Sequence, residues 1–427
     1  MTQSAHNVSF LQQRNREDRG VDAPDVPVGK IDRVGIIGAG VMGCGIAAAN
    51  IRNGLDVVIT DASSDALDRC QPQILADAQA AVDAFSSHRE TETELAARLS
   101  KATHEADVAG CDLIIESIVE NLEVKRRVLA RLGPEIRDEA ILATNTSTFP
   151  VTQMASGLRR PERFCGIHFC NPVQHRRLVE VVRGERTDDI TVATSVVYAK
   201  RLGKLPIVVK DRPGFLVNRL LLPYLNEAVE LFCEGAPFED LERVSRAFGM
   251  QMGPLEMYDM IGTDTSFYAG RTMWEAFRDR IVPSPVLPAM IKRGRLGQKS
   301  GLGFYSHAST PPVLDPRVPD LLSIYVREQR PFSDEQLTAR LFLPMLLEAT
   351  RALADGVVRD ARDVDLGVIF GLGFPESKGG LLFWADSLGA DTILQMLEPL
   401  KDLGPRFHAT ELLLRMASNS ERFYEIG

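Results

Sequence analysis

His168 and Glu180 are isolated ionisable residues inside two neighbouring apolar segments of the chain. A carboxylate among apolar side chains is unfavourable unless it is paired, and a histidine is a natural partner. A histidine that takes a proton from a hydroxyl group near neutral pH in turn needs an anion to stabilise its imidazolium form. The spacing is also compatible with purely structural roles. His168 could be a hydrogen-bonded core histidine, and Glu180 could form an ion pair with Arg176 or Arg177.

A glycine-rich motif, Gly38-Ala39-Gly40-Val41-Met42-Gly43, directly follows the β-rich run Arg33–Ile37 and opens an apolar stretch of helical composition. The pattern G-x-G-x-x-G alone is a weak signal, because glycine also makes ordinary turns, but its position between a strand and a helix is typical of a dinucleotide site. We expect Gly38 to form the tight turn, Gly40 to let a pyrophosphate approach, and Gly43 to let the helix pack on the strand.

Asp61 ends the next β-rich run, Asp56–Thr60. A carboxylate at this point accepts hydrogen bonds from the ribose hydroxyls and repels a 2′-phosphate, so the sequence favours NAD over NADP. The alternative is a solvated aspartate in a turn.

Further polar residues follow another β-rich run. Asn145-Thr146-Ser147-Thr148 comes after Ala140–Thr144, where strand ends meet in a crevice of an open α/β sheet, although a turn or a helix cap would use the same residues. Asn218 lies in the first turn of a long predicted helix, where a cap or surface asparagine is the default interpretation.

The elements that must position these residues form two classes. Up to about residue 210 the β-rich runs alternate with helical segments or turns, which predicts an α/β fold with a largely parallel sheet. We expect a helical hairpin inserted at residues 63–101. After Asp211-Arg212-Pro213-Gly214 the β-rich runs vanish and the pattern becomes helical, so a domain boundary is predicted there. The expected strands are Arg33–Ile37, Asp56–Thr60, Leu113–Glu116, Ala140–Thr144, Phe164–Phe169, Leu178–Val182 and Leu205–Val209.

The helical part contains an internal duplication. Residues 219–228 match residues 340–349 at most positions, including a proline inside each helical segment, and Gly262-Thr263-Asp264 recurs as Gly389-Ala390-Asp391. Proline inside a helix is strongly unfavourable, so its repetition at one register favours two copies of common origin. The predicted domains are a disordered tail (1–28), a Rossmann domain (29–211), a first helical domain (212–307) and a second, degenerate helical copy (320–427).

Composition excludes several functional classes. A net charge of −9 leaves no excess of basic residues for general nucleic-acid binding. No apolar run is long enough to span a bilayer, and residues 1–28 lack the apolar core of a signal peptide. The six cysteines lack C-x-x-C spacing and lie mostly in apolar surroundings, so we expect reduced thiols and a cytoplasmic protein.

Taken together, the chain resembles the 3-hydroxyacyl-CoA dehydrogenase family. The resemblance covers about residues 30–307, and the second helical copy is similar to the end of the dehydrogenase half of the multifunctional β-oxidation α subunit, without the hydratase/isomerase domain that precedes it there. It implies oxidation of L-3-hydroxyacyl-CoA to 3-oxoacyl-CoA, with NAD as cofactor and no metal. The segments that carry it are GIIGAGVMGCGIA (35–47), ESIVENLEVK (116–125), NTST (145–148), HFCNP (168–172), LVEVV (178–182), KDRPGFLVNRLLLPYLNEA (210–228), GQKSGLGFY (297–305) and GLGFPESKGG (371–380).

The resemblance also implies roles for individual residues. His168 would be the general base, oriented by Glu180, and Ser147 and Asn218 would hydrogen-bond the reacting oxygen or the thioester carbonyl. The positions that line the NAD site in the family are matched by Met42, Asp61, Glu120, Lys125 and Asn171.

Two departures from the family pattern concern substrate binding. The hairpin that binds CoA in the family is usually rich in lysine, whereas near its start only Arg69 remains here. In the second helical copy an aromatic hydroxyl is replaced by Trp384, a donor of different reach. We therefore expect altered CoA contacts and an altered acyl-chain preference.

The duplication also bears on assembly and on alternatives. The contact that forms the dimer in the family would be made here between the two copies within one chain, so we expect a monomer. In the second copy Ala339 stands at the position equivalent to Asn218, so we expect one active site per chain. A separate hydratase or thiolase partner is compatible with this chain.

Two competing interpretations of the function remain open. One is a dehydrogenase of free 3-hydroxy acids or polyols, and the other is a non-catalytic NAD-binding scaffold or docking subunit.

Overall fold

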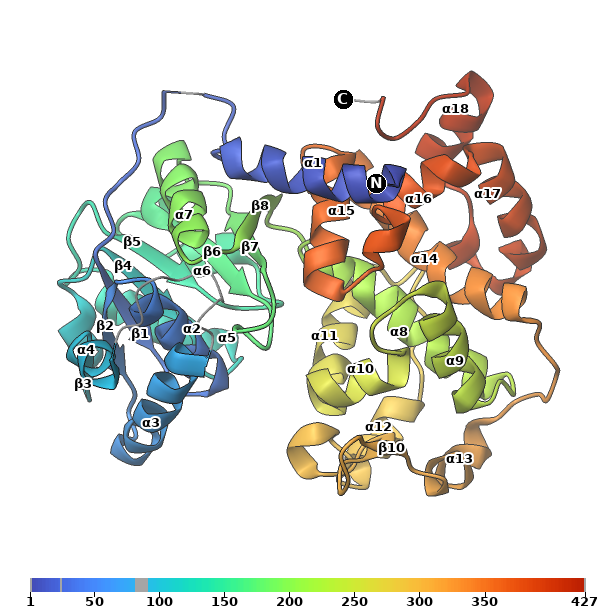
Figure 1. Cartoon of the computed structure of the whole chain (residues 1–427), viewed down its shortest axis with the longest axis horizontal. Helices are drawn as coiled ribbons and strands as arrows, with labels where there is room; N and C mark the ends of the chain where they lie inside the picture. The colour runs from blue at the N-terminus through green and yellow to red at the C-terminus, as the bar shows by residue number, and fades with distance from the viewer. Residues whose placement is uncertain (1, 24, 81–90, 426–427) are drawn as a thin grey trace. The chain divides into compact units, whose positions relative to one another are not determined.

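The computed structural model of the chain describes residues 2–23, 25–80 and 91–425. Their contacts divide the chain into two compact units. The first, here called the sheet unit, is Gln12–Phe215, and the second, the helical unit, is Met1–Leu11 with Leu216–Gly427 (Figure 1).

The described part of the sheet unit holds an eight-stranded sheet in the order β3-β2-β1-β4-β5-β6-β7-β8. Neighbouring strands are parallel except for the antiparallel pair β6 and β7. The expected runs are confirmed to within one residue, because buried apolar runs are what such a sheet requires. The strands are β1 (Arg33–Ile37), β2 (Asp56–Thr60), β3 (Leu99–Ala102), β4 (Leu113–Glu116), β5 (Ile141–Thr144), β6 (Phe164–Phe169), β7 (Leu178–Arg183) and β8 (Leu205–Lys210).

Helices cover this sheet and share its apolar core, in which residues of α2, α3 and α7 pack with alternate residues of the strands. Side-chain caps begin several of them: Asn121 accepts a hydrogen bond at the start of α5, and Asp188 does so at the start of α7. The helices are α2 (Val41–Arg52), α3 (Ser64–Ala80), α4 (Glu92–Ala97), α5 (Leu122–Leu132), α6 (Val151–Ala155) and α7 (Asp189–Arg201).

The expected helical hairpin at residues 63–101 is correct only in part. Helices α3 and α4 occupy its two ends, and residues 81–90 lie outside the described part of the chain. Its last residues instead form β3, which pairs with β2 at the edge of the sheet. This strand is polar and only partly buried, so it lacks the apolar run that identified the other strands.

The prediction of a disordered tail at residues 1–28 is wrong for residues 3–17, which form helix α1 (Gln3–Glu17). Val8 and Leu11 of this helix are buried. The Asn7 amide donates to the Gly379 carbonyl at 2.8 Å, and the Asn15 amide donates to the carbonyl of Pro206 at 2.6 Å. Partners so distant in the sequence cannot be inferred from the composition of the segment itself.

The helical unit is built around α8 and α14, which pack against each other and each contain an internal proline. A short antiparallel hairpin, β9 (Tyr305–Ser306) with β10 (Val313–Leu314), lies where the first predicted helical domain ends. The helices are α8 (Val217–Cys233), α9 (Phe238–Phe248), α10 (Pro254–Ile261), α11 (Thr263–Ala276), α12 (Val286–Lys292), α13 (Arg317–Leu322), α14 (Asp334–Ala354), α15 (Ala361–Gly367), α16 (Leu381–Leu388), α17 (Ala390–Leu397) and α18 (Glu411–Asn419).

The expectation that all six cysteines are reduced is contradicted for Cys44 on α2 and Cys70 on α3, which form a disulfide. The packing of α2 on α3 brings their Cα atoms to 5.8 Å, a proximity that the sequence alone does not reveal. The other four cysteines are buried free thiols. No helix in the described part of the chain has the length and apolar content that crossing a bilayer requires.

Candidate active site

His168 and Glu180 face each other in the ladder that joins β6 to β7. The His168 Nδ1 atom lies 2.7 Å from the Glu180 Oε2 atom, and Glu180 is fully buried while 7% of His168 is exposed. A carboxylate accepts the Nδ1 proton, which leaves Nε2 of the neutral ring as the basic nitrogen. The Phe215 ring packs beside the imidazole with its centroid at 5.9 Å. The sheet therefore holds an oriented histidine base with a buried counter-charge.

Cys170 follows β6 directly but is not equipped to act as a nucleophile. Burial, reinforced by the negative charge of Glu180, raises the pKa of its thiol to about 12. The thiol stays protonated near neutral pH and is therefore a packing residue.

The glycine-rich turn between β1 and α2 has the geometry that a dinucleotide phosphate needs. Gly38 has a φ of 113°, and a Cβ atom there would lie 2.5 Å from the Ser117 carbonyl oxygen. A Cβ at Gly43 would lie 1.9 Å from the Gly38 oxygen, so both positions require glycine. A Cβ at Gly40 would meet nothing within 4 Å. The N-terminus of α2 thus faces open space, where its backbone amides can receive a phosphate.

Asp61 follows β2 and lies against this turn. Its Oδ2 atom accepts a hydrogen bond from the Ala39 amide at 2.9 Å, and its Oδ1 atom accepts one from the Ser63 amide at 2.9 Å. The carboxylate is therefore fixed beside the phosphate-binding loop, where the ribose of a dinucleotide lies. Together with the glycine geometry, this donor and acceptor set fits NAD.

Lys125 is almost fully buried and binds two carboxylates. Its Nζ atom lies 2.7 Å from Glu116 Oε1 and 3.1 Å from Glu120 Oε2. Glu116 also accepts hydrogen bonds from the Thr144 hydroxyl at 2.7 Å and from the Ile118 amide at 2.8 Å. Lys125 thereby ties the segment after β4 to the end of β5, rather than presenting its charge at the surface.

Glu120 joins this network to the Asn145–Thr148 segment. Its Oε1 atom accepts hydrogen bonds from the Thr146 hydroxyl at 2.6 Å and the Ser147 amide at 3.1 Å, and lies 3.5 Å from the Ser147 hydroxyl. Burial raises the pKa of Glu120, but the Lys125 ammonium and these hydrogen bonds outweigh it and hold the pKa below its ordinary value. Glu120 is therefore an anion that positions Ser147.

Sequence reasoning missed two residues that organise the site, Glu116 and Thr144, whereas it did point to Asn145. The Asn145 Oδ1 atom accepts a hydrogen bond from the Phe169 amide at 2.9 Å, which fixes the end of β5 beside the strand that carries His168. Glu116 could have been found, because a carboxylate that ends an apolar strand requires a buried partner.

The remaining predicted residues are more scattered. Met42 is half-buried in the first turn of α2, Asn171 is exposed after β6, and Arg69 is exposed on α3. Asn218, the second residue of α8, and Trp384 belong to the helical unit. Trp384 is buried there with its ring edge-on to another aromatic ring, that of Phe248, at 5.3 Å.

Two sequence-family models match the chain. The sequence model for the NAD binding domain of 3-hydroxyacyl-CoA dehydrogenase matches residues 33–212, and the model for the C-terminal domain matches residues 214–307. The chain is 38% identical over 416 residues to the α subunit of the fatty acid oxidation complex of Pseudomonas putida, which covers 95% of this chain. The chain spans only 58% of the length of that relative.

Two solved structures are similar over their whole length. The 3-hydroxybutyryl-CoA dehydrogenase of Escherichia coli K12 superposes with a TM-score of 0.80 at 28% identity and covers 92% of this chain. The (S)-3-hydroxybutyryl-CoA dehydrogenase of Ralstonia eutropha superposes with a TM-score of 0.60 at 35% identity and covers 66% of this chain. This chain covers 100% of each of the two.

Proposed function

The chain belongs to the 3-hydroxyacyl-CoA dehydrogenase family, and from this premise we propose that it oxidises the 3-hydroxyl group of an L-3-hydroxyacyl-CoA thioester. The sheet unit is the NAD-binding Rossmann-like domain of that family, and a helical C-terminal domain follows it. The observation that carries the proposal is the 2.7 Å contact between His168 and the fully buried Glu180.

In the proposed reaction His168 Nε2 takes the proton of the 3-hydroxyl group while the C3–O bond becomes a carbonyl. NAD, when bound, would supply the acceptor for the C3 hydrogen, which leaves with its electron pair as hydride. The imidazolium that forms on His168 is stabilised by the negative charge of Glu180, which is strong because the pair is withdrawn from water. Glu180 acts through His168 and is a positioning residue.

We assign polarisation of the substrate to Ser147 and Asn218, which would hydrogen-bond the reacting oxygen or the thioester carbonyl. The support for Ser147 is the hydrogen bond that its backbone amide donates to Glu120, because a residue already fixed in this way loses little entropy when its hydroxyl binds the substrate. Met42 and Asn171 are assigned to the NAD site. Arg69 is assigned to a CoA phosphate and Trp384 to packing that affects acyl preference.

The helical unit is proposed to consist of two tandem copies, and reciprocal ion pairs support this. Arg219 on α8 binds Glu348 on α14 at 3.0 Å, while Arg340 on α14 binds Glu227 on α8. Both arginines and both glutamates are separated by the same 121 positions that relate the matching helix sequences. Equivalent residues that contact one another reciprocally are expected at a twofold interface between related copies.

A second buried feature also recurs. Glu242 and Asp365 each accept hydrogen bonds from two consecutive backbone amides and from a tyrosine hydroxyl. Such a shared arrangement of partners supports common origin more strongly than sequence identity at single positions. The donors are Leu255, Glu256 and Tyr305 for Glu242, and Leu382, Phe383 and Tyr424 for Asp365.

Tandem copies lead to a proposal about assembly. The second copy would occupy the surface of the first within one chain, so the chain would be a monomer with one active site, because Ala339 stands where Asn218 stands in the first copy. A separate hydratase or thiolase would supply the neighbouring steps.

A dehydrogenase of free 3-hydroxy acids is a second candidate. It is favoured by one observation: in the described part of the segment 63–101, Lys101 is paired with Asp68, the neighbour of Arg69 in the sequence, at 2.7 Å, which weakens the attraction for CoA phosphates. The test is NADH formation with L-3-hydroxybutyryl-CoA, a longer L-3-hydroxyacyl-CoA and free 3-hydroxybutyrate, for wild type and His168→Ala. Turnover of the thioesters that collapses in the variant supports the proposal, whereas turnover of the free acid alone supports the second candidate.

A further inference from the structure

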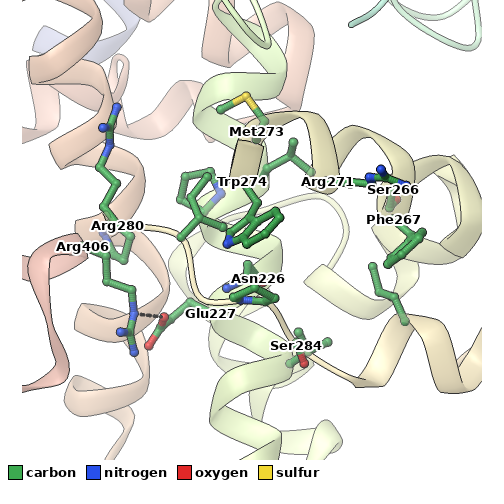
Figure 2. Close-up of a pocket in the computed structure, with 18 of the residues that line it drawn as sticks. Asn226, Glu227, Ser266, Phe267, Arg271, Met273, Trp274, Arg280, Ser284 and Arg406 are labelled. Carbon is green, nitrogen blue, oxygen red and sulfur yellow. Dashed lines mark hydrogen bonds and ion pairs between the residues drawn. The ribbon is translucent and has the colours of Figure 1, made fainter. Parts of the chain in front are cut away.

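The helical unit contains a cavity of about 470 Å³ (Figure 2). None of the residues assigned to the reaction lines it. Its walls come from α8, α10, α11, α12 and α14, from the segment 280–284 between α11 and α12, and from Arg406. All of these elements belong to the one compact unit. The volume lies within the range of small-molecule sites.

One wall of the cavity continues from the proposed catalytic amide. Along α8 every residue is buried except four: Asn218, Leu222, Pro223 and Asn226. These residues recur at helical spacing and form one stripe. Leu222, Pro223 and Asn226 line the cavity. At the helical rise, Leu222 lies roughly 6 Å and Asn226 roughly 12 Å beyond Asn218 along the axis.

The lining indicates an uncharged, apolar occupant. Its arginines are already paired with carboxylates of the unit: Arg406 binds Glu227 at 3.0 Å, and Arg280 binds Glu348 (Figure 2 shows the first pair). The Asn226 amide donates to a backbone carbonyl, that of Val282, at 3.1 Å. An anion such as a CoA phosphate would have to displace these carboxylates, whereas a hydrocarbon chain needs only the apolar surface between them.

We propose that this cavity holds the hydrocarbon tail of the acyl group, so that the chain prefers medium- or long-chain thioesters over four-carbon ones. The inference rests on the proposed function, which puts the reacting end of the substrate at Asn218. Carbons beyond C3 then follow the α8 stripe past Leu222 into the cavity. The Glu227–Arg406 pair forms part of the lining and sets a limit, because an apolar tail that displaced it would leave charges unpaired.

Gly270 on α11 offers a direct test. It lines the cavity, and a Cβ atom added there meets nothing within 4 Å, so a side chain enters empty space without disturbing the helix. Gly270→Leu should also favour helix formation. We expect the ratio of kcat/KM for 3-hydroxydecanoyl-CoA to that for 3-hydroxybutyryl-CoA to fall about tenfold or more, the discrimination that one or two methylenes carry in an apolar pocket. The matched control is Ala276→Leu, at an exposed position on the same helix outside the lining.

Trp274 gives a readout that does not depend on turnover. It lines the cavity, and the chain has only one other tryptophan. Decanoyl-CoA, but not acetyl-CoA, should change the fluorescence of the full chain, and Trp274→Phe should abolish the change. An unaltered ratio in Gly270→Leu alongside turnover of thioesters overturns the inference and leaves the proposed function standing. If no thioester is oxidised, the proposed function fails. In that case a fluorescence change with decanoyl-CoA still supports the cavity assignment, and the absence of a change overturns it.

Discussion

The Nδ1 atom of His168 and the Oε2 atom of Glu180 lie 2.7 Å apart across an antiparallel strand pair, in which the two residues are direct partners. Because Glu180 is fully buried, its charge is not screened by water and acts on the imidazole at close range. The chemistry proposed for the site therefore depends on a backbone register as much as on the two residue types.

Glu180→Gln tests this dependence, because glutamine keeps an acceptor for the Nδ1 proton but removes the charge. We expect kcat to fall about a hundredfold or more, within the range ascribed to general base catalysis, with the affinity for NAD unchanged. The pH profile of kcat should shift as well, which a purely structural role would not produce. Glu185→Gln, an exposed carboxylate shortly after the same strand, is the control. Retained activity in Glu180→Gln would contradict the assigned role.

Asp61→Ser tests the choice of cofactor. The change removes the acceptor fixed by the Ala39 amide and the charge that repels a 2′-phosphate. We expect the KM for NAD to rise about tenfold, as for loss of a hydrogen bond to a charged group, and the preference for NAD over NADP to narrow. Steady-state kinetics with both cofactors measure this, beside Asp65→Ser in the exposed first turn of α3. An unchanged cofactor ratio would remove Asp61 from the site.

Lys125→Met tests whether the buried lysine is structural support. The variant leaves Glu116, which is fully buried, without its cation. We expect the free energy of unfolding to fall by about 3–5 kcal/mol, the typical effect of breaking a buried ion pair. The double variant Lys125→Met/Glu116→Gln should recover part of this loss, and urea unfolding of the three proteins measures it. Equal stability of all three would show that the pair contributes nothing.

The sequence was informative where one local pattern determines the outcome. The β-rich runs were predictable because a sheet buried on both faces needs apolar strands, and the antiparallel approach of two such runs is what pairs His168 with Glu180. The edge strand Leu99–Ala102 escaped because it is polar and partly exposed. Helix α1 and the Cys44–Cys70 bond escaped because their partners lie on other elements, a dependence that local composition does not carry.

The buried carboxyl group of Asp365 should make the stability of the helical unit depend on pH. Burial raises the pKa of its carboxyl group to about 7, despite hydrogen bonds from the Leu382 and Phe383 amides and the Tyr424 hydroxyl. In the unfolded chain the group titrates near 4. Between these values the folded chain holds a proton that the unfolded chain has lost, so the free energy of unfolding falls as pH rises, by at most about 1.4 kcal/mol per pH unit. The contribution is therefore complete below about pH 4 and gone above about pH 7.

Asp365→Asn should remove this dependence, because an amide does not titrate in that window. We expect the free energy of unfolding of the wild-type chain to fall relative to that of the variant as the pH is raised from about 5 to about 7. The amide changes one hydrogen bond and so shifts the whole curve of the variant by a constant amount, which does not affect this comparison. Urea unfolding at several pH values, monitored by circular dichroism, gives the two curves. The control is Asp391→Asn, at an exposed position on α17. Asp360 is not used because its side chain caps α15. Parallel curves for wild type and Asp365→Asn would mean that the carboxyl group is ionised in the folded chain throughout this range.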